Sequence, residues 1–565
     1  NLDLLDTYLA VWPDRLRELL LGEPTYRFFD DPDVILPRDS KTVRVGEERI
    51  RRYGAVVRDA EKEAMIASRA VEPWSVRTEH GKGEVFRCTL LVKLLVLLAN
   101  RAATLDPSGL GVDMEADKPG WNDSMNGLPG IFGSALNESL ELLRLARFVS
   151  GSLTSLEAAG EKSARVFVEL ADMIDELSEL MDARLEDDTR EGTLRYWDAS
   201  NAVKERYRDE TRMGVAGEER EVALGALVTF SRKVERMLQD ALEDRPAGEV
   251  RSEEGVPYTY LVHRVGAFEE LGRESHQGLP LVRAKSFERR PVKLFLEGPV
   301  HWMKVLPQDA ADVYRAVKES PLYDRKLGMY KSCEDMTGED PELGRAVGAY
   351  PRGWIENESI YLHMEYKYLL EILPSGLAKE FFEDMKGALM PFQPPERYGR
   401  SILEGASFVV SSAFADAKHH GQAFQPRLSG ITCEFVHMWT LMVAGPAPFG
   451  VSEGGDLELR LEPRLAEWLF TKEPSRRRIA EPGGGWKEIE VPADAFSFAF
   501  LGKTLVTYRN PGRRPTYGSE AALPRRWELE YQDGKKKVIE ADRLTGSIAE
   551  DVRAGKVSRM DVELG

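Results

Sequence analysis

A Gly- and Pro-rich segment, residues 118–138, carries the first side chains that could do chemistry. It places Asp123 directly after Trp121 and Asn122. A carboxyl group held protonated near neutral pH by an apolar site can act as a general acid. The face of an aromatic ring covers a sugar well, and amides bond its hydroxyl groups. The segment is therefore a candidate sugar subsite with the carboxyl group of Asp123 beside it, although a solvated connection between two helices is the simpler alternative.

Further along the chain, a second group of residues could bind an anion. Ser429 and Gly430 precede an expected helix, whose free backbone N–H groups and positive dipole end favour a ligand such as phosphate. Arg427 and His363 are candidate side-chain donors to the same anion. Taken singly, each has a structural explanation: a helix cap for Ser429, a surface ion pair for Arg427 and a hydrogen-bonded structural histidine for His363.

A second sugar-binding segment is expected around Trp354, which precedes Glu356. Ordinary packing of a buried Trp is the alternative for this residue. Three motifs thus follow one another in the chain: Trp121-Asn122-Asp123, then Glu356-Asn357 leading to His363, then Ser429-Gly430.

In their order and spacing, these motifs resemble the cellobiose phosphorylase group of inverting glycoside phosphorylases, a glycoside hydrolase family 94-like group that includes oligoglucan phosphorylases. The resemblance covers roughly residues 85–150 and 340–511. Where the group has Asp-Trp-Asn-Asp, this chain has Gly120 before Trp121, and its Ser429 replaces a Thr while keeping a hydroxyl.

The resemblance implies a reaction and its residues. A β-linked gluco-oligosaccharide would be cleaved by phosphate to α-glucose 1-phosphate, with Asp123 as the general acid. Phosphate would be the nucleophile and a co-substrate, so that no metal or organic cofactor is expected. Its expected ligands are His363, Ser429 and Gly430, with Arg427 added from the sequence. The sugars would be oriented by Trp121, Asn122 and Glu356, with Trp354 nearby.

The resemblance also implies an (α/α)6 barrel with a small β cap at the C-terminus and an N-terminal β-sandwich, which this sequence does not show. We therefore expect a mainly α protein. Residues 1–84 would form a helical and irregular segment, 85–444 the barrel with a helical insertion at about 150–250, and 445–565 a β-rich domain. An Asp-Gly pair at 533–534, between two alternating stretches, predicts a hairpin there.

Composition excludes several classes of function. The chain is 42% hydrophobic and 30% charged, the balance of a globular protein, and its formal net charge of −18 disfavours nucleic acid or an anionic membrane as a partner. Its three cysteines form no Cys-x-x-Cys pair, and its eight histidines include no His-Glu-x-x-His motif. These counts predict a reducing, cytoplasmic location and no zinc site. A homodimer, or association with a missing N-terminal portion, is a possible assembly.

Two other functions fit the same residues. One is an inverting hydrolase or glucan-processing enzyme, with Glu138, Glu356 or Glu404 as the base. The other is a non-catalytic carbohydrate-binding subunit.

Overall fold

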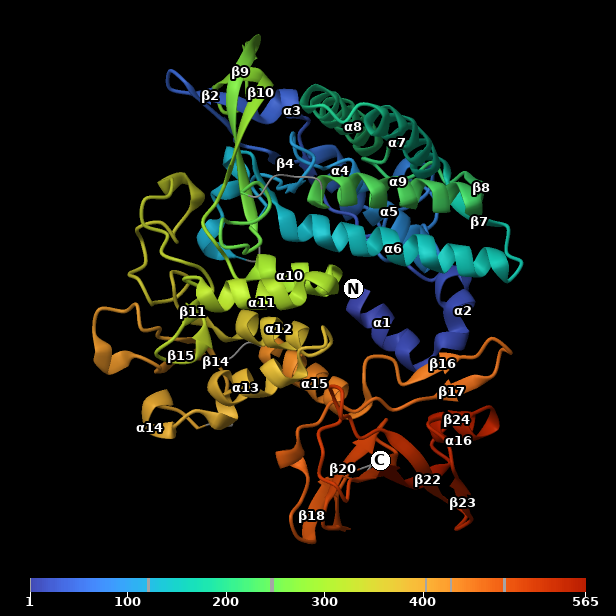
Figure 1. Cartoon of the computed structure of the whole chain (residues 1–565). Coiled ribbons are helices and arrows are strands. Elements are labelled where there is room, and N and C mark those ends of the chain that lie inside the picture. The colour runs from blue at the N-terminus through green and yellow to red at the C-terminus, as the bar shows by residue number, and fades with distance from the viewer. Residues whose placement is uncertain (1, 119–121, 244–247, 402–403, 427–428, 481–483) are drawn as a thin grey trace. The chain divides into compact units, whose positions relative to one another are not determined.

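The computed structural model describes residues 2–118, 122–243, 248–401, 404–426, 429–480 and 484–565, with the side chains of Asp123, Glu243, Pro426 and Ser429 also left undescribed. The chain divides into two compact units (Figure 1). Unit 1 comprises Asn1–Leu16, Leu369–Gln393 and Arg427–Gly565, and unit 2 comprises Arg17–Tyr368 and Pro394–Pro426. Each is described by itself.

The predicted mainly α fold with an (α/α)6 barrel is wrong. Helices hold 40% and strands 25% of the structure, and the strands include a six-stranded and a five-stranded sheet. The six-stranded sheet lies in unit 2 and has the order β3-β2-β10-β9-β6-β5. Its strands are β2 (Thr42–Val45), β3 (Arg49–Arg52), β5 (Val112–Asp113), β6 (Gly133–Ala135), β9 (Tyr260–Glu274) and β10 (Pro280–Pro291).

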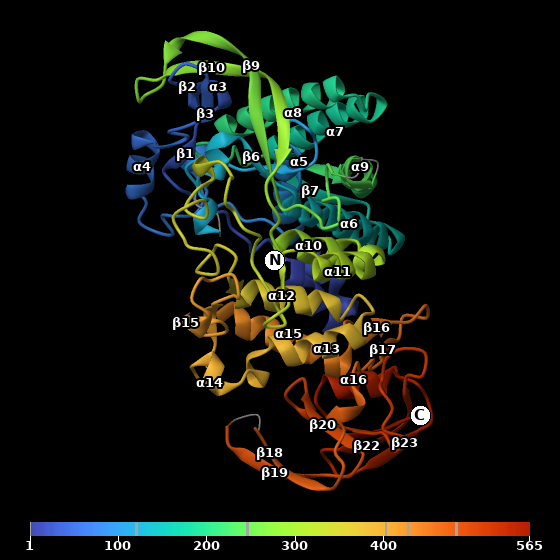
Figure 2. The ribbon, with the colours of Figure 1, turned by 60° about the vertical axis from the view of Figure 1, so that its left-hand side comes forward.

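Strands β9 and β10 form a long antiparallel hairpin that extends beyond the rest of the sheet (Figure 2). The sequence alternates at Tyr260 and Val262, which predicts only a short strand there. Past Gly266 the strand carries exposed or half-exposed residues on both faces, so the hydrophobic alternation that marks a half-buried strand is lost.

Helices cover this sheet in unit 2. Helix α6 packs against α9 and α10, and α7 packs against α8. The main helices are α5 (Leu90–Ala102), α6 (Leu136–Ala158), α7 (Val168–Glu186), α8 (Arg190–Glu210), α9 (Leu224–Glu243), α10 (Glu297–Val305) and α11 (Ala310–Glu319). The apolar stripe in residues 155–187 predicts a single long helix. The chain is instead interrupted there at Gly160, which has a φ of +103°, and by β7 (Ser163–Phe167), which pairs with β8 (Glu219–Ala223).

The sheet has a hydrophobic cluster on each face. Tyr260, Val262 and Ala135 belong to one cluster, together with Met125 and Leu128 from the loop before β6. Phe132, Phe287 and Trp197 of α8 form the other. Because neighbouring residues of a strand point to opposite faces, β9 presents Tyr260 to one side and His263 to the other.

Smaller elements complete unit 2. They are α2 (Leu16–Leu21), α3 (Arg38–Lys41), α4 (Ala60–Ala67), α14 (Pro395–Tyr398), β1 (Asp33–Ile35), β4 (Val56–Arg58), β11 (Tyr323–Asp324), β12 (Met329–Tyr330), β13 (Ile360–Tyr361), β14 (Ala406–Val409) and β15 (Ala423–Pro426). Strands β13, β14 and β15 form a three-stranded sheet. The pattern of residues 401–414 predicts a helix, and this prediction is wrong because β14 lies there. Helix α12 (Leu362–Ile372) runs across the unit boundary.

Unit 1 is built on a five-stranded sheet of order β20-β21-β25-β22-β23. The hairpin predicted at residues 533–534 is confirmed, since β22 pairs antiparallel with β23. The elements of the unit are α1 (Leu2–Val11), α13 (Ala378–Ala388), α15 (Ser429–Ala444), α16 (Ser547–Arg553), β16 (Phe449–Val451), β17 (Leu457–Leu459), β18 (Ser475–Ala480), β19 (Trp486–Val491), β20 (Ala495–Phe500), β21 (Thr504–Arg509), β22 (Pro524–Tyr531), β23 (Lys536–Ile539), β24 (Leu544–Thr545) and β25 (Val557–Leu564).

The two ends of the chain meet in unit 1. The Arg553 guanidinium of α16 donates hydrogen bonds to both carboxylate oxygens of Asp14, at 2.6 and 3.0 Å, and one to the Val11 carbonyl. It also lies 4.4 Å from the centre of the Trp12 ring. Across the described ranges, we find no helix that is long and apolar enough to cross a membrane.

Candidate functional site

The first motif and the second motif meet in unit 2. The backbone N–H of Ser124 donates a 2.8 Å hydrogen bond to Glu356 Oε2, although the two residues are 232 positions apart. Ser124 Oγ donates to Asn122 Oδ1, also at 2.8 Å, and Asn122 is 8% exposed. Glu356 therefore fixes the backbone immediately after Asp123, where a short 3-10 helix (Asp123–Met125) begins.

Glycine is required where this loop crosses its neighbours. A Cβ at Gly127 would lie 1.8 Å from the Glu342 carbonyl oxygen, and the Gly127 N–H donates to the Leu343 carbonyl at 3.0 Å. At Gly133, a Cβ would lie 2.3 Å from the Leu128 side chain. The Gly-rich composition of the segment thus follows from close packing of its backbone.

Asn122 and Glu356 line one small cavity of about 10 Å³, room for about one water molecule. The cavity walls come from the loop before the 3-10 helix, the start of α10, and the segment that leads through β13 into α12. They consist of Asn122, Phe295, Glu297, Ser332, Glu356, Tyr361 and Met364.

The sequence did not point to two polar groups beside this cavity, Glu297 and Tyr260. The Tyr260 hydroxyl donates to Glu297 Oε2 at 3.1 Å, and the Asn122 side chain also hydrogen-bonds Tyr260. Burial, together with the Glu297 carboxylate, raises the pKa of Tyr260 well above its usual value. The signal that could have revealed Glu297 is a single carboxylate within an apolar run that becomes the first turn of α10.

Trp354 lies near this site but is engaged in packing. Its ring stacks on Phe424 with centroids 4.0 Å apart and an interplanar angle of 1°, and it lies 5.7 Å from the Phe414 ring. One face of the indole is therefore occupied by β15.

His363 stands in the first turn of α12, between two residues that line the cavity, Tyr361 and Met364. The His363 and Tyr361 rings lie 6.0 Å apart in an edge-to-face arrangement. Burial, followed by the Glu356 charge, raises the pKa of Tyr361. The structure thus places His363 close in sequence to the walls of the Asn122–Glu356 cavity.

The third motif belongs to the other unit. Ser429 and Gly430 begin the 16-residue helix α15 of unit 1, which confirms the helix expected at this place. Trp121, Arg427 and Gly120 lie outside the described residues, as do the side chains of Asp123 and Ser429.

The other two candidate bases lie in surface ion pairs. Glu138 pairs with Arg101 at 2.6 Å with its side chain 40% exposed, and Glu404 pairs with Arg400 at 2.5 Å with its side chain 55% exposed. Of the three carboxylates proposed for the hydrolase alternative, Glu356 lines the cavity.

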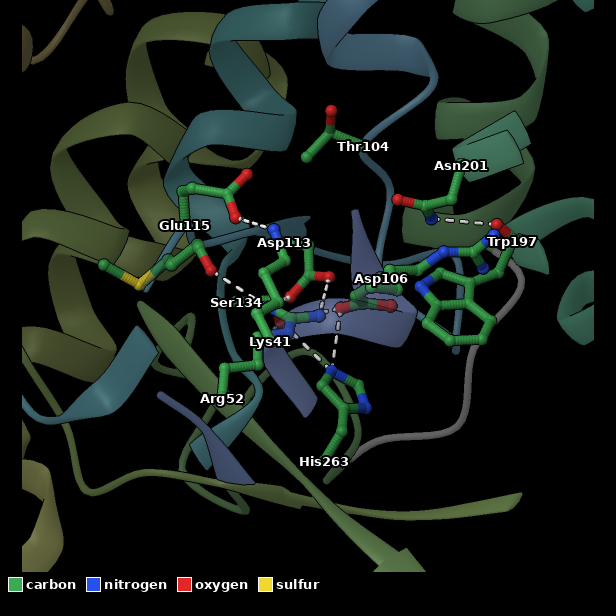
Figure 3. Close-up of polar contacts among 12 residues, drawn as sticks. Lys41, Arg52, Thr104, Asp106, Asp113, Glu115, Ser134, Trp197, Asn201 and His263 are labelled. Atoms are coloured by element: carbon green, nitrogen blue, oxygen red, sulfur yellow. Dashed lines mark hydrogen bonds and ion pairs between the residues drawn. The ribbon is translucent and has the colours of Figure 1, made fainter. Parts of the chain in front are cut away.

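A second polar centre lies among β2, β3, β5 and α8 (Figure 3). Arg52 donates to Asp113 Oδ1 at 2.9 Å, with both side chains nearly fully buried, and Lys41 pairs with Glu115. Lys204 of α8 donates to Thr104 Oγ1 at 3.2 Å, and burial lowers the pKa of its ammonium group to about 7. This centre ties the N-terminal strands to α8, which is a structural role.

Within the described ranges, no group of three or more His, Cys, Asp or Glu side chains is arranged to hold a metal ion. A scan against protein-family models and a search of curated proteins both find no match to this chain.

Proposed function

We propose that this chain cleaves a β-glucosidic bond of a gluco-oligosaccharide with inversion, using inorganic phosphate as the nucleophile and releasing α-glucose 1-phosphate. The hydrogen bond from Ser124 N–H to Glu356 Oε2 carries the proposal. It supports the resemblance because it joins two of its three motifs at one cavity.

In this reaction Asp123 protonates the glycosidic oxygen while a phosphate oxygen attacks the anomeric carbon, so that the C–O bond to the leaving sugar breaks as the new C–O bond forms. Phosphate already is the nucleophile, and a single carboxyl group therefore suffices. Glu356 and Asn122 orient the sugar, with Trp121 and Trp354. In unit 2, His363 is the ligand that we propose for the phosphate.

One observation favours hydrolysis as a second candidate. Glu297 and Glu356 line the same water-sized cavity. An inverting hydrolase needs a carboxylate that activates a water molecule opposite the general acid. Glu297 or Glu356 would be that base, with Asp123 again the acid.

We further propose a cytoplasmic location for this activity. Cys88, Cys333 and Cys433 are all free thiols, which suits a reducing compartment. The partners proposed are the oligosaccharide and phosphate.

The test is a panel of β-1,2-, β-1,3- and β-1,4-linked gluco-oligosaccharides, given to the full chain with and without phosphate. Glucose 1-phosphate should form only with phosphate. Asp123→Asn should abolish it, whereas the control Glu404→Gln, at an exposed ion pair, should not. Release of glucose without phosphate would instead establish the hydrolase, and no cleavage of any member under either condition would refute both.

A further inference from the structure

A buried histidine lies on the face of the sheet opposite to Tyr260. His263 of β9 is 1% exposed, and its Nε2 lies 3.0 Å from Asp106 Oδ2 and 3.1 Å from Ser134 Oγ (Figure 3). Asp106 is fully buried and accepts hydrogen bonds from Ser134 Oγ at 2.7 Å and from the backbone N–H of Gly111 at 2.7 Å. The interaction with His263 and these hydrogen bonds hold the pKa of Asp106 well below its usual range despite its burial. An ionised Asp106 fixes the proton of His263 on Nε2.

The second ring nitrogen of His263, Nδ1, is a buried polar atom. His263 Nδ1 has no hydrogen-bond partner among the described residues, and in Figure 3 it points away from Asp106 and Ser134. A buried polar atom without a partner costs folding free energy, so its retention calls for an explanation such as a ligand.

His263 lines a cavity of about 270 Å³. The N-terminus of the 21-residue helix α8 contributes to the same wall, which places the positive end of its dipole at the cavity. Two arginines, Arg190 and Arg289, supply guanidinium groups there. The remaining lining residues are Pro107, Ser108, Asp188, Thr193, Glu249 and Phe287.

The cavity is lined by two arginines and two carboxylates. Arg289 pairs with Glu249 at 2.5 Å, which neutralises that carboxylate, and Arg190 donates to the Phe287 carbonyl with the rest of its guanidinium uncommitted by that bond. Asp188 is exposed, where it can accept hydrogen bonds from sugar hydroxyls. Guanidinium forks and a helix N-terminus together match the oxygens of a phosphoryl group.

We propose that this cavity binds a small phosphate-bearing ligand, with the phosphoryl group against Arg190, Arg289 and the start of α8, and with His263 Nδ1 accepting a hydrogen bond from a hydroxyl group of the ligand. The site is separate from the Asn122–Glu356 cavity, because the two lie beside opposite faces of the sheet. It does not rest on the proposed glycoside cleavage.

The test follows His263 itself. The full chain is labelled with ¹³C in its eight histidines, and the His263 resonance is assigned with His263→Asn. Inorganic phosphate, glucose 6-phosphate and glucose are then added at matched ionic strength. We expect glucose 6-phosphate or phosphate to shift the His263 resonance, with glucose giving no shift. The compound of these two that binds more tightly shows whether the natural ligand is free phosphate or a phosphate ester of a sugar. The response should persist in His363→Asn, which separates this site from the phosphate contacts proposed for catalysis.

Arg190→Gln provides the decisive variant, because Arg190 is exposed and glutamine keeps an amide donor for the Phe287 carbonyl. It should weaken binding about tenfold, the effect of one charge-assisted hydrogen bond. The matched control Arg236→Gln, at an exposed arginine of α9 that pairs with Asp240, should bind as the wild type does. An unmoved His263 resonance with both phosphate ligands, an equal shift with glucose, or full affinity in Arg190→Gln would each overturn the proposal.

Discussion

At the scale of single residues, Glu356 is the group on which the candidate site depends most. Its carboxylate accepts the Ser124 N–H and faces the same cavity as Asn122. Besides orienting the sugar, as proposed, Glu356 would act on the reaction through the position of the loop that carries Asp123.

Glu356→Gln should slow glycoside cleavage about 100-fold, because a small displacement of the acid is enough to lose that much. It should also lower the free energy of unfolding by about 1–2 kcal/mol, since a neutral amide oxygen accepts the Ser124 N–H less strongly than a carboxylate. Initial rates and urea unfolding measure the two effects. Glu404→Gln is the control, and equal behaviour of the two variants would contradict the role given to Glu356.

Lys204 gives a prediction about pH. Burial lowers the pKa of its ammonium group to about 7, whereas an unfolded chain has a lysine pKa of about 10.4. Between these values the unfolded chain binds a proton that the folded chain does not. The free energy of unfolding should therefore rise with pH from 7 toward 10, by at most about 1.4 kcal/mol per pH unit from this group.

Lys204→Met should remove this rise and be more stable than the wild type below pH 7, where the buried charge is fully present. Urea unfolding at pH 6, 7, 8 and 9 provides the measurement. Lys379→Met, at an exposed lysine, should keep the wild-type slope. If Lys204→Met keeps that slope too, the buried lysine does not titrate as proposed.

At the scale of elements, the loop before β6 is positioned by the absence of a side chain at Gly127. Its backbone lies against the Glu342 carbonyl, and no Cβ can fit between them. The same loop then leads directly to Asn122 and Asp123 on one side and to β6 on the other.

Gly127→Ala should shift this loop and reduce glycoside cleavage by at least tenfold, with a loss of roughly 1–3 kcal/mol in stability, the usual cost of overpacking. Gly151→Ala is the matched control, because Gly151 is an exposed residue of α6 with nothing near its Cβ position. It should gain about 0.5–1 kcal/mol. Thermal unfolding and initial rates report both, and a harmless Gly127→Ala would show that the loop can move without consequence.

The elements that sequence patterns predicted correctly are local ones. The hairpin of β22 and β23 needs only its Asp-Gly turn and flanking alternation. The spacing of apolar residues over 378–389 predicts a helix, and α13 lies there. The six-stranded sheet was missed because several of its strands have two to four residues, too few to show alternation, and their partners lie far away in sequence. Strand β14 is equally short, and for the same reason the sequence pattern around it predicts a helix instead.

In the candidate site, too, sequence patterns reveal some residues and miss others that only the fold brings together. The order of the motifs suggested that Asn122 and Glu356 belong together, and the structure joins them through Ser124. Tyr260 and Glu297 could not have been found in this way, since what distinguishes them is a hydrogen bond between β9 and α10 in a buried place.

At the scale of the whole molecule, unit 1 is assembled from three separate stretches of chain. Its contact between Arg553 and the segment from Val11 to Asp14 joins residues up to 542 positions apart. Arg553 is 10% exposed in its side chain, and its bonds lower the pKa of Asp14.

Arg553→Met should loosen the N-terminal helix α1 without disturbing unit 2. Limited proteolysis should then cut near residues 11–16 several times faster than in the wild type, because the guanidinium no longer holds Asp14 and Val11. Arg525→Met, an exposed arginine of β22 that pairs with Glu563, is the control. Unchanged cleavage at the N-terminal helix in Arg553→Met would show that other contacts hold it.

The bond between Asp14 and Arg553 also sets a delay during synthesis of the protein. The two residues are separated by 539 positions, and ribosomes add about 5–20 residues per second, so the partner of α1 emerges roughly half a minute to two minutes after α1 itself. Throughout that interval the Asp14 carboxylate and the Val11 carbonyl lack the guanidinium group that binds them in the folded chain. Unit 1 can therefore close only after the segment that carries Arg553 has been synthesised, which makes its completion a late step in the folding of this chain.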